Sequence, residues 1–206
     1  MEGDIKDRIK RFKSNILDEE NYSIEKIINQ YIVFGTPYIF KDDEEKYYNL
    51  KDKIATFFEV NQRDIFMTGS SKLGFSIAPS KLWRPIDGNP NKDSDIDIVI
   101  ISDRIFDKYW KSILEYKEST IAISDDAKNH SEFLEYFFKG WLRPDKFPYK
   151  YSGSNEWFEF FREVSYKKEL GARKVAAAIY REEYFFEKYH TENLKGIRNI
   201  LKGKGE

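Results

Sequence analysis

The feature that most constrains this chain is a pair of acidic residues, Asp95 and Asp97, inside the apolar run SDIDIVII that ends at Ile101. Side chains on a β-strand alternate between two faces, so a strand here would direct both aspartates to one face and the intervening Ile96 to the other. Carboxylates are depleted in strands and costly to bury without a partner. The pattern therefore predicts a strand whose polar face binds a cation or a set of hydrogen-bond donors.

A second motif, GSSK at residues 69–72, follows the apolar segment IFMT, which predicts a strand, a turn and then a short helix. Glycine permits a close approach of the backbone, and N–H groups at the start of a helix attract anions. Carboxylate oxygens suit Mg²⁺ or Mn²⁺ and leave room for water and phosphate oxygens. We therefore expect metal ligands at Asp95 and Asp97 beside a phosphate cradle. The residues expected in the cradle are Gly69, Ser70, Ser71 and Lys72, with Lys72 as a charge partner of the phosphates.

In combination these residues resemble the nucleotidyltransferase superfamily, which includes DNA polymerase β, the CCA-adding enzymes, poly(A) polymerases and small stand-alone bacterial transferases. The family pattern is a Gly-Ser on a short helix followed by a strand that carries Asp-x-Asp. Here the pattern is Gly69-Ser70 and Asp95-Ile96-Asp97, so the resemblance covers the central part of the chain. It implies transfer of a nucleoside monophosphate from a nucleoside triphosphate to a protein, RNA or nucleotide acceptor. It also implies catalytic roles for Ser70 and for the two aspartates as Mg²⁺ ligands.

The spacing of the two motifs departs from the family pattern. Ser70 and Asp95 are 25 positions apart, which is longer than the usual connection, and we interpret Ser80 to Lys92 as an inserted loop. Its proline, glycine and polar residues predict a surface excursion that Trp83 and Ile86 hold against the body. A second interpretation is that the loop contacts substrate, with Arg84 as the residue that does so.

The resemblance also implies a third carboxylate on a neighbouring strand, and the sequence does not show where it lies. The strand expected at residues 174–180, KVAAAIY, contains no acidic residue. Acidic candidates elsewhere are Asp145, Glu163, Glu182 and Glu183. An alternative function is therefore a catalytically inactive module of the same fold that binds a nucleotide or a protein partner, as an antitoxin or a defence-associated sensor.

Around this core the sequence predicts a single α+β domain over residues 1–206, in which a small mixed sheet is packed by amphipathic helices at both ends. An N-terminal helical layer would span residues 1–60, the motif core 61–101, and a mainly helical part 102–206. Apolar residues at three- and four-residue spacings predict the helices. The expected helices span 4–17, 23–35, about 43–58, a segment starting near 103, about 125–139, 154–169 and 182–202.

Composition excludes several other functions. A net charge of −1 gives no electrostatic basis for nonspecific nucleic-acid binding, and the absence of cysteine excludes disulfides and thiolate catalysis. No apolar run approaches the ~20 residues that a membrane span needs, and the N-terminus lacks the apolar core of a signal peptide, so we expect a cytoplasmic protein without membrane contact. His130 and His190 have no matching ligand partner on their predicted helices and are interpreted as non-catalytic.

Overall fold

The central strand, β2 (Ile96–Ile101), organises a four-stranded sheet in the computed structural model of the chain, which describes residues 2–89, 93–119, 127–148 and 151–203. The strand order is β1-β2-β4-β3, where β1 is Ile65–Thr68, β3 is Trp141–Leu142 and β4 is Val175–Tyr180. β2 runs antiparallel to β1 and parallel to β4, and β3 runs antiparallel to β4. The expected mixed sheet and α+β class are therefore confirmed.

Side chains of β2 alternate between the two faces of the sheet, and Val99, on the same face as Asp97, is also buried. The β-branched side chains of Ile96, Ile98 and Ile100 are buried on one face, whereas Asp97 is exposed on the other. Such residues favour strands because they pack well on a pleated surface. The three isoleucines therefore determine which face of the sheet carries Asp97.

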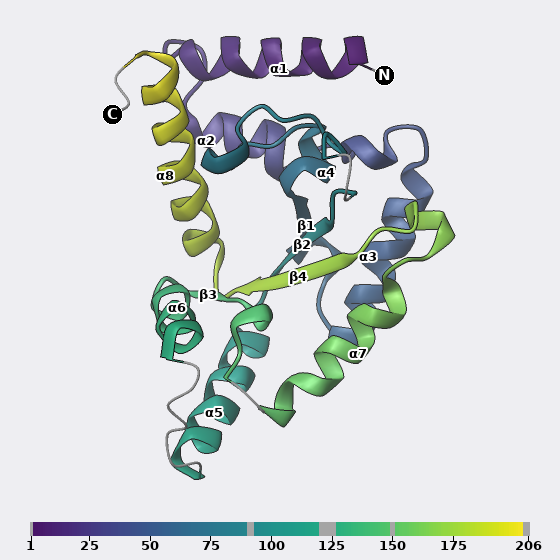
Figure 1. Cartoon of the computed structure of the whole chain (residues 1–206), viewed down its shortest axis with the longest axis vertical. Helices are drawn as coiled ribbons and strands as arrows, with labels where there is room; N and C mark the ends of the chain where they lie inside the picture. Colours follow the sequence, from purple (N-terminus) through teal and green to yellow (C-terminus); the bar gives the residue numbers. More distant parts are fainter. Residues whose placement is uncertain (1, 90–92, 120–126, 149–150, 204–206) are drawn as a thin grey trace.

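Three helices cover the face with the isoleucines, namely α3 (Glu44–Phe58), α5 (Asp103–Ser119) and α7 (Asn155–Val164) (Figure 1). Their apolar side chains form one core cluster with those of the sheet, and α6 (Ala127–Phe138) adds Phe133 to it. The cluster is rich in aromatic rings, which explains much of the high aromatic content of the chain.

The other face is covered by α1 (Glu2–Leu17), α2 (Ile24–Ile27), the π-helical turn η1 (Ile28–Val33), α4 (Gly69–Leu73) and α8 (Glu183–Leu201). Figure 1 shows the C-terminal end of α1 beside the C-terminal end of α8, and the Arg198 guanidinium of α8 donates to the Ile16 carbonyl of α1. A second core cluster joins these elements to the sheet.

The prediction that residues 1–60 form one helical layer is wrong, because their helices pack on both faces of the sheet. α1 and α2 pack on one face of the sheet, and α3 packs on the other. The chain passes between the faces at η2 (Tyr38–Phe40), where Tyr38 belongs to one core cluster and Phe40 to the other. Both faces of this sheet carry apolar side chains, and each has to be covered.

The predicted starts of three helices are confirmed by their caps. The side-chain oxygens of Ser23, Asp43 and Ser102 accept hydrogen bonds from backbone N–H groups three residues onward, at 3.1, 3.3 and 3.2 Å. Each of these bonds satisfies one N–H group that the first turn of a helix leaves unpaired. Asp125, where α6 was expected to begin, lies outside the described residues.

Two elements differ from expectation. α7 ends at Val164 instead of residue 169, because the Ser165 hydroxyl donates to the Phe161 carbonyl at 2.6 Å and accepts from Val175 N–H at 2.9 Å. The chain after Ser165 is thereby joined to β4. β3 was not predicted, since a two-residue strand has no periodicity of its own. The remaining 3₁₀ helices are η3 (Gln62–Asp64), η4 (Pro79–Lys81), η6 (Pro144–Lys146), η7 (Ser152–Ser154) and η8 (Lys168–Leu170).

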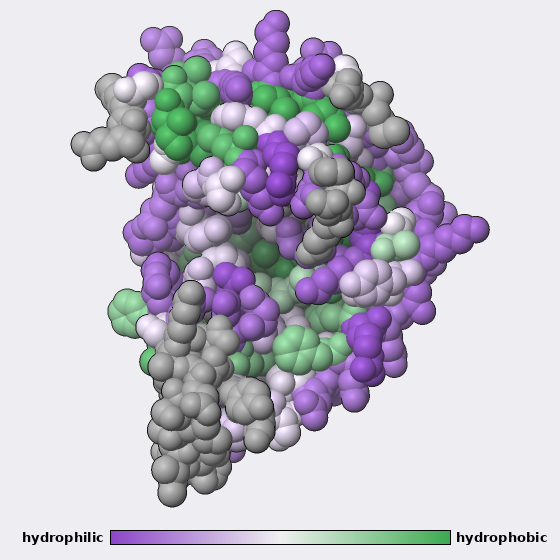
Figure 2. Space-filling view, in the orientation of Figure 1, coloured by the Kyte–Doolittle hydropathy of each residue, from purple (hydrophilic) through white to green (hydrophobic). Residues whose placement is uncertain are grey.

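The view in Figure 2 is mostly hydrophilic, and hydrophobic side chains gather at its upper left, over the C-terminal end of α8. Leu17 and Ile200, near the ends of α1 and α8, are exposed hydrophobic residues. Among the described residues, no helix combines the length and the apolar character needed to cross a membrane.

His190 of α8 lies in the core and is only 7% exposed. Its Nδ1 has no hydrogen-bond partner in the described part of the chain, and burial lowers the pKa of the imidazole to about 4. Below its ordinary pKa of 6.5 the unfolded chain binds a proton that the folded protein does not. The stability contributed by neutral His190 is therefore present above pH 6.5 and is lost as the pH falls toward 4.

We expect the free energy of unfolding to fall by up to about 3 kcal/mol between pH 6.5 and pH 4 through His190 alone. His190→Leu should remove this part of the pH dependence. Urea unfolding of both proteins at the two pH values measures the difference. The same pH dependence in both proteins would show that another group is responsible.

Candidate functional site

Asp97 is the exposed residue of β2 and lies between Thr68 of β1 and Ala176 of β4. Paired residues on adjacent strands direct their side chains to the same face of a sheet. The Asp97 carboxylate therefore has a threonine on one side and the methyl group of an alanine on the other.

Gly69 follows Thr68 directly and brings the backbone against Asp97. Its φ of +69° is in the left-handed region, and a Cβ added to it would overlap Asp97 Oδ2. Any side chain at this position would therefore displace the carboxylate as well as strain the turn. Glycine is required here by both backbone conformation and space.

The side chains of Ser70, Ser71 and Lys72, which follow Gly69, point to three different surroundings. Ser70 lines the pocket described below. Ser71 is fully buried, and its hydroxyl donates to the Asp95 carbonyl at 2.6 Å. The Ser71 side chain therefore holds the approach to β2 in place rather than facing the pocket.

Lys72 lies outside the pocket lining, which corrects the expectation that its ammonium group is a charge partner of phosphates. It is 3% exposed, and its Nζ donates to the Phe34 carbonyl at 2.7 Å and to the Gly35 carbonyl. Burial lowers the pKa of this lysine to about 8. Lys72 thus joins α4 to the segment that follows η1.

The motif residues surround a pocket of about 150 Å³. The Gly-Ser turn, the inserted loop and the approach to β2 all contribute to its lining. The lining residues with chemical groups of interest are Ser70, Lys81, Arg84, Asp93, Asp95 and Asp97. The structure therefore brings the predicted Ser70, Asp95 and Asp97 together with the cationic residues of the loop.

The inserted loop packs against the body of the protein, as the sequence predicts. The Trp83 ring lies 6.0 Å from the rings of Phe12 and Phe75. Ile86 packs against the same core cluster. Lys92, at the end of the predicted insert, lies outside the described residues.

Arg173, just before β4, fastens the loop to the sheet. Its guanidinium donates to both carboxylate oxygens of Asp87, at 2.7 and 2.6 Å, and to the Ser94 carbonyl at 3.0 Å. The hydrogen bond from Arg173 lowers the pKa of the Asp87 carboxyl group. Asp87 also accepts from Ser94 N–H at 2.8 Å, so Arg173 and Asp87 hold Ser94, which lines the pocket.

Sequence reasoning missed Arg173, Asn89 and Asp93. Asp93 could have been found, because it lies two positions before Asp95 and continues the alternation that joins Asp95 to Asp97. Asn89 and Arg173 had no such signal. Arg173 approaches the pocket only because β4 pairs with β2.

None of the four acidic candidates for a third carboxylate lines the pocket. Glu182 pairs with Arg181 at 2.6 Å, and Glu183 begins α8. They follow the far end of β4, which is itself roughly 13 Å along the strand from Ala176. Both glutamates therefore lie beyond the end of β4 that is farther from Asp97.

The other two candidates lie on different elements. Glu163 is exposed on α7, which covers the face of the sheet opposite Asp97. Asp145 is bound by Arg143 at 2.7 Å in η6, which follows the edge strand β3. On β4 itself, the position paired with Asp97 is Ala176.

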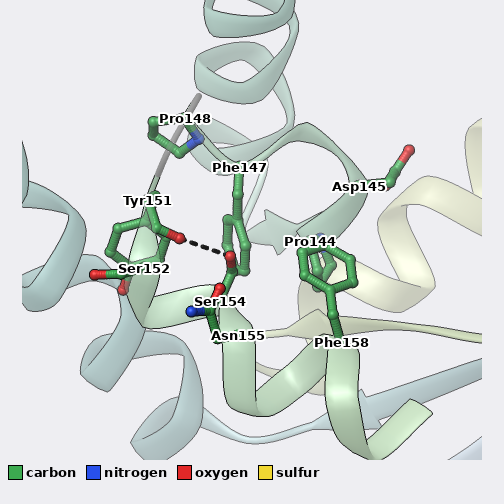
Figure 3. Close-up of a pocket in the computed structure, with 9 residues that line it drawn as sticks. All are labelled: Pro144, Asp145, Phe147, Pro148, Tyr151, Ser152, Ser154, Asn155 and Phe158. Carbon is green, nitrogen blue, oxygen red and sulfur yellow. Dashed lines mark hydrogen bonds between the residues drawn. The ribbon is translucent and has the colours of Figure 1, made fainter. Parts of the chain in front are cut away.

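Asp145 instead lines a separate hollow of about 370 Å³ between η6 and α7 (Figure 3). Proline and aromatic rings, including those of Pro144, Phe147 and Phe158, make up much of its lining. The Ser154 hydroxyl, drawn with a dashed line, donates to the Tyr151 carbonyl at 2.7 Å. This hollow shares no lining residue with the motif pocket.

Comparison of the chain with protein-family models, with curated proteins and with solved structures found no match.

The donor set of the pocket fits a magnesium ion that is bound together with a ligand. Proteins commonly hold Mg²⁺ through one or two carboxylates, with water and substrate phosphates as the other ligands. Asp95 and Asp97 can supply the two carboxylates. No group of three histidine or acidic side chains that could hold a metal occurs among residues 2–89, 93–119, 127–148 and 151–203. Because phosphate oxygens would add ligands to the two carboxylates, we expect the ion to bind more tightly with phosphate than alone.

Gly69→Ala should move the Asp97 carboxylate and weaken Mn²⁺ binding roughly tenfold, because one of two ligands is displaced. Isothermal titration calorimetry with Mn²⁺ measures the change. Gly35→Ala is the matched control, since Gly35 has a φ of +77° and no atom within 4 Å of an added Cβ. Equal Mn²⁺ affinity of the two variants would show that the contact between Gly69 and Asp97 does not affect metal binding.

Proposed function

We propose that this protein is a Mg²⁺-dependent nucleotidyltransferase that transfers a nucleoside monophosphate from a nucleoside triphosphate to a hydroxyl group of a protein, RNA or nucleotide. The observation that carries the proposal is the convergence of Ser70, Asp95 and Asp97 on one pocket. The resemblance of these same residues to the superfamily pattern supports it.

In such a reaction the acceptor hydroxyl attacks the α-phosphorus, the bond to the bridging oxygen of the β-phosphate breaks, and pyrophosphate leaves. The hydroxyl proton is released. Bound Mg²⁺ neutralises charge on the phosphate oxygens. Asp95 and Asp97 would hold the ion, and the Ser70 hydroxyl would donate to a phosphate oxygen. Since this catalysis depends on positioning and electrostatics, it needs no cysteine or histidine nucleophile.

The fixed position of Asp97 also supports the proposal. Its backbone is held in the middle of the sheet by strands on both sides, and its carboxylate is confined by Gly69. Asp95 is held through its carbonyl by Ser71. Ligands held in this way lose little freedom when they bind an ion, which strengthens binding.

A second candidate function is a catalytically inactive module that binds a nucleotide or a protein partner in the same pocket. The specific observation in its favour is Ala176, which pairs with Asp97 where an acidic residue would complete a three-carboxylate site. Binding of Mg²⁺ and nucleotide would then persist without turnover.

The first test is transfer of label from nucleoside triphosphates in the presence of Mg²⁺ and cell extract, with pyrophosphate release measured in parallel. Asp97→Asn keeps the shape of the side chain and removes its charge, and we expect it to reduce transfer by roughly 100-fold or more. Asp7→Asn, at an exposed position of α1, is the control and should transfer at the wild-type rate. Equal labelling by Asp97→Asn would contradict the enzyme proposal.

The second test restores the carboxylate that β4 lacks. Ala176→Asp should tighten Mn²⁺ binding roughly tenfold by adding a third charged ligand beside Asp97. In an inactive module it should also create pyrophosphate release where the wild type has none. Ala178→Asp is the control, because it lies on the same face of β4 but pairs with Val99. Weaker metal binding in Ala176→Asp than in the wild type would contradict this reading of position 176.

A further inference from the structure

The inserted loop is built to hold its side chains in fixed places. Ser76 N–H donates to the Arg84 carbonyl and Trp83 N–H to the Ser76 carbonyl, both at 2.8 Å, and Ile86 N–H donates to the Gly74 carbonyl at 2.9 Å. These bonds join residues 83–86 of the loop to the segment 74–76 that follows α4. The clamp between Arg173 and Asp87 fastens its far end to the sheet. The backbone that carries Arg84 is therefore ordered before any ligand arrives.

Lys81 and Arg84 differ from the other cations near the site. Arg173 is paired with Asp87, and the Lys72 ammonium group donates to backbone carbonyls. In the described part of the chain, no carboxylate lies within ion-pair distance of Lys81 or Arg84, although both line the pocket that Asp95 and Asp97 line. Among the described residues, these two cations of the pocket therefore have no carboxylate partner.

An exposed lysine or arginine is most often simply solvated. Two observations distinguish this pair, namely its place in the lining of the motif pocket and the backbone hydrogen bonds that hold the loop. A suitable ligand must carry negative charge to the cations and bring a metal ion to the carboxylates. A polyphosphate that chelates Mg²⁺ meets both requirements.

We propose that Lys81 and Arg84 bind the β- and γ-phosphates of the nucleoside triphosphate. This inference rests on the proposed function, because it names the residues that hold the part of the substrate that leaves as pyrophosphate. The planar guanidinium of Arg84 can donate two parallel hydrogen bonds to one phosphate, whereas Lys81 acts as a point charge. The inserted loop is then half of the substrate site and not only a surface excursion.

Inorganic tripolyphosphate with Mg²⁺ is the probe, because it has no base and so avoids the question of base preference. We expect the double variant Lys81→Ala and Arg84→Ala to bind it at least roughly tenfold more weakly in calorimetry. The matched control is Lys10→Ala with Arg162→Ala, which removes the same charge from exposed positions on α1 and α7. The control should bind tripolyphosphate as the wild type does.

Mn²⁺ binding without phosphate should be no weaker in the Lys81→Ala and Arg84→Ala variant, since Asp95 and Asp97 are intact and two positive charges that repel the ion are removed. Its unfolding midpoint should match the wild type, because neither side chain is among those that hold the loop. Equal tripolyphosphate affinity in the double variant and the wild type would overturn this inference while leaving the proposed function in place. An equal loss in the control would overturn it too, by showing that only net charge matters. A wild type that binds neither tripolyphosphate nor any nucleoside triphosphate would overturn the proposed function itself.

Discussion

The contact between the Asp97 carboxylate and the backbone of Gly69 determines the shape of the site. It exists because β1 pairs with β2 so that Thr68 lies opposite Asp97, and the turn at Gly69 begins one residue later. A shift of one residue in this register would turn the Asp97 carboxylate into the core cluster of the isoleucines and put an isoleucine in its place at the pocket. The buried isoleucines of β2 therefore hold the polar site on the opposite face, although none of them touches it.

The side of the site beside β4 depends on the long connection from β2 to β4. A parallel pair needs a crossover, and the one from β2 to β4 contains α5, α6, β3 and α7. Its return brings Arg173 and Ala176 beside the motif. Arg173 strengthens the site by fastening the loop, whereas Ala176 leaves it with one carboxylate fewer than the resemblance implies. The return of the chain to the sheet thus fastens the loop and leaves the position beside Asp97 without a carboxylate.

Local patterns predicted most of the elements, and long-range contacts decided the rest. Periodicity and caps were sufficient for α1, α3, α5, α8 and both long strands, because these signals lie within one element. The division of the N-terminal helices between the two faces could not be predicted, since α1 and α3 are both amphipathic and either face accepts them. The pair between Arg173 and Asp87 spans 86 positions and depends on the sheet register. In the site, the alternation of aspartates indicated Asp95 and Asp97, whereas no pattern indicated Asn89 or Arg173.

Lys72 shows how helix geometry separates residues that are adjacent in sequence. Successive residues of a helix turn by about 100°, so Lys72 points about 200° away from Ser70 around the axis of α4. Ser70 lines the pocket, Ser71 reaches Asp95, and Lys72 reaches the backbone after η1. The Gly-Ser helix therefore supplies a hydroxyl group to the pocket and no side-chain cation. Positive charge for a phosphate tail has to come from another element, and the inserted loop is the element that brings lysine and arginine to that pocket.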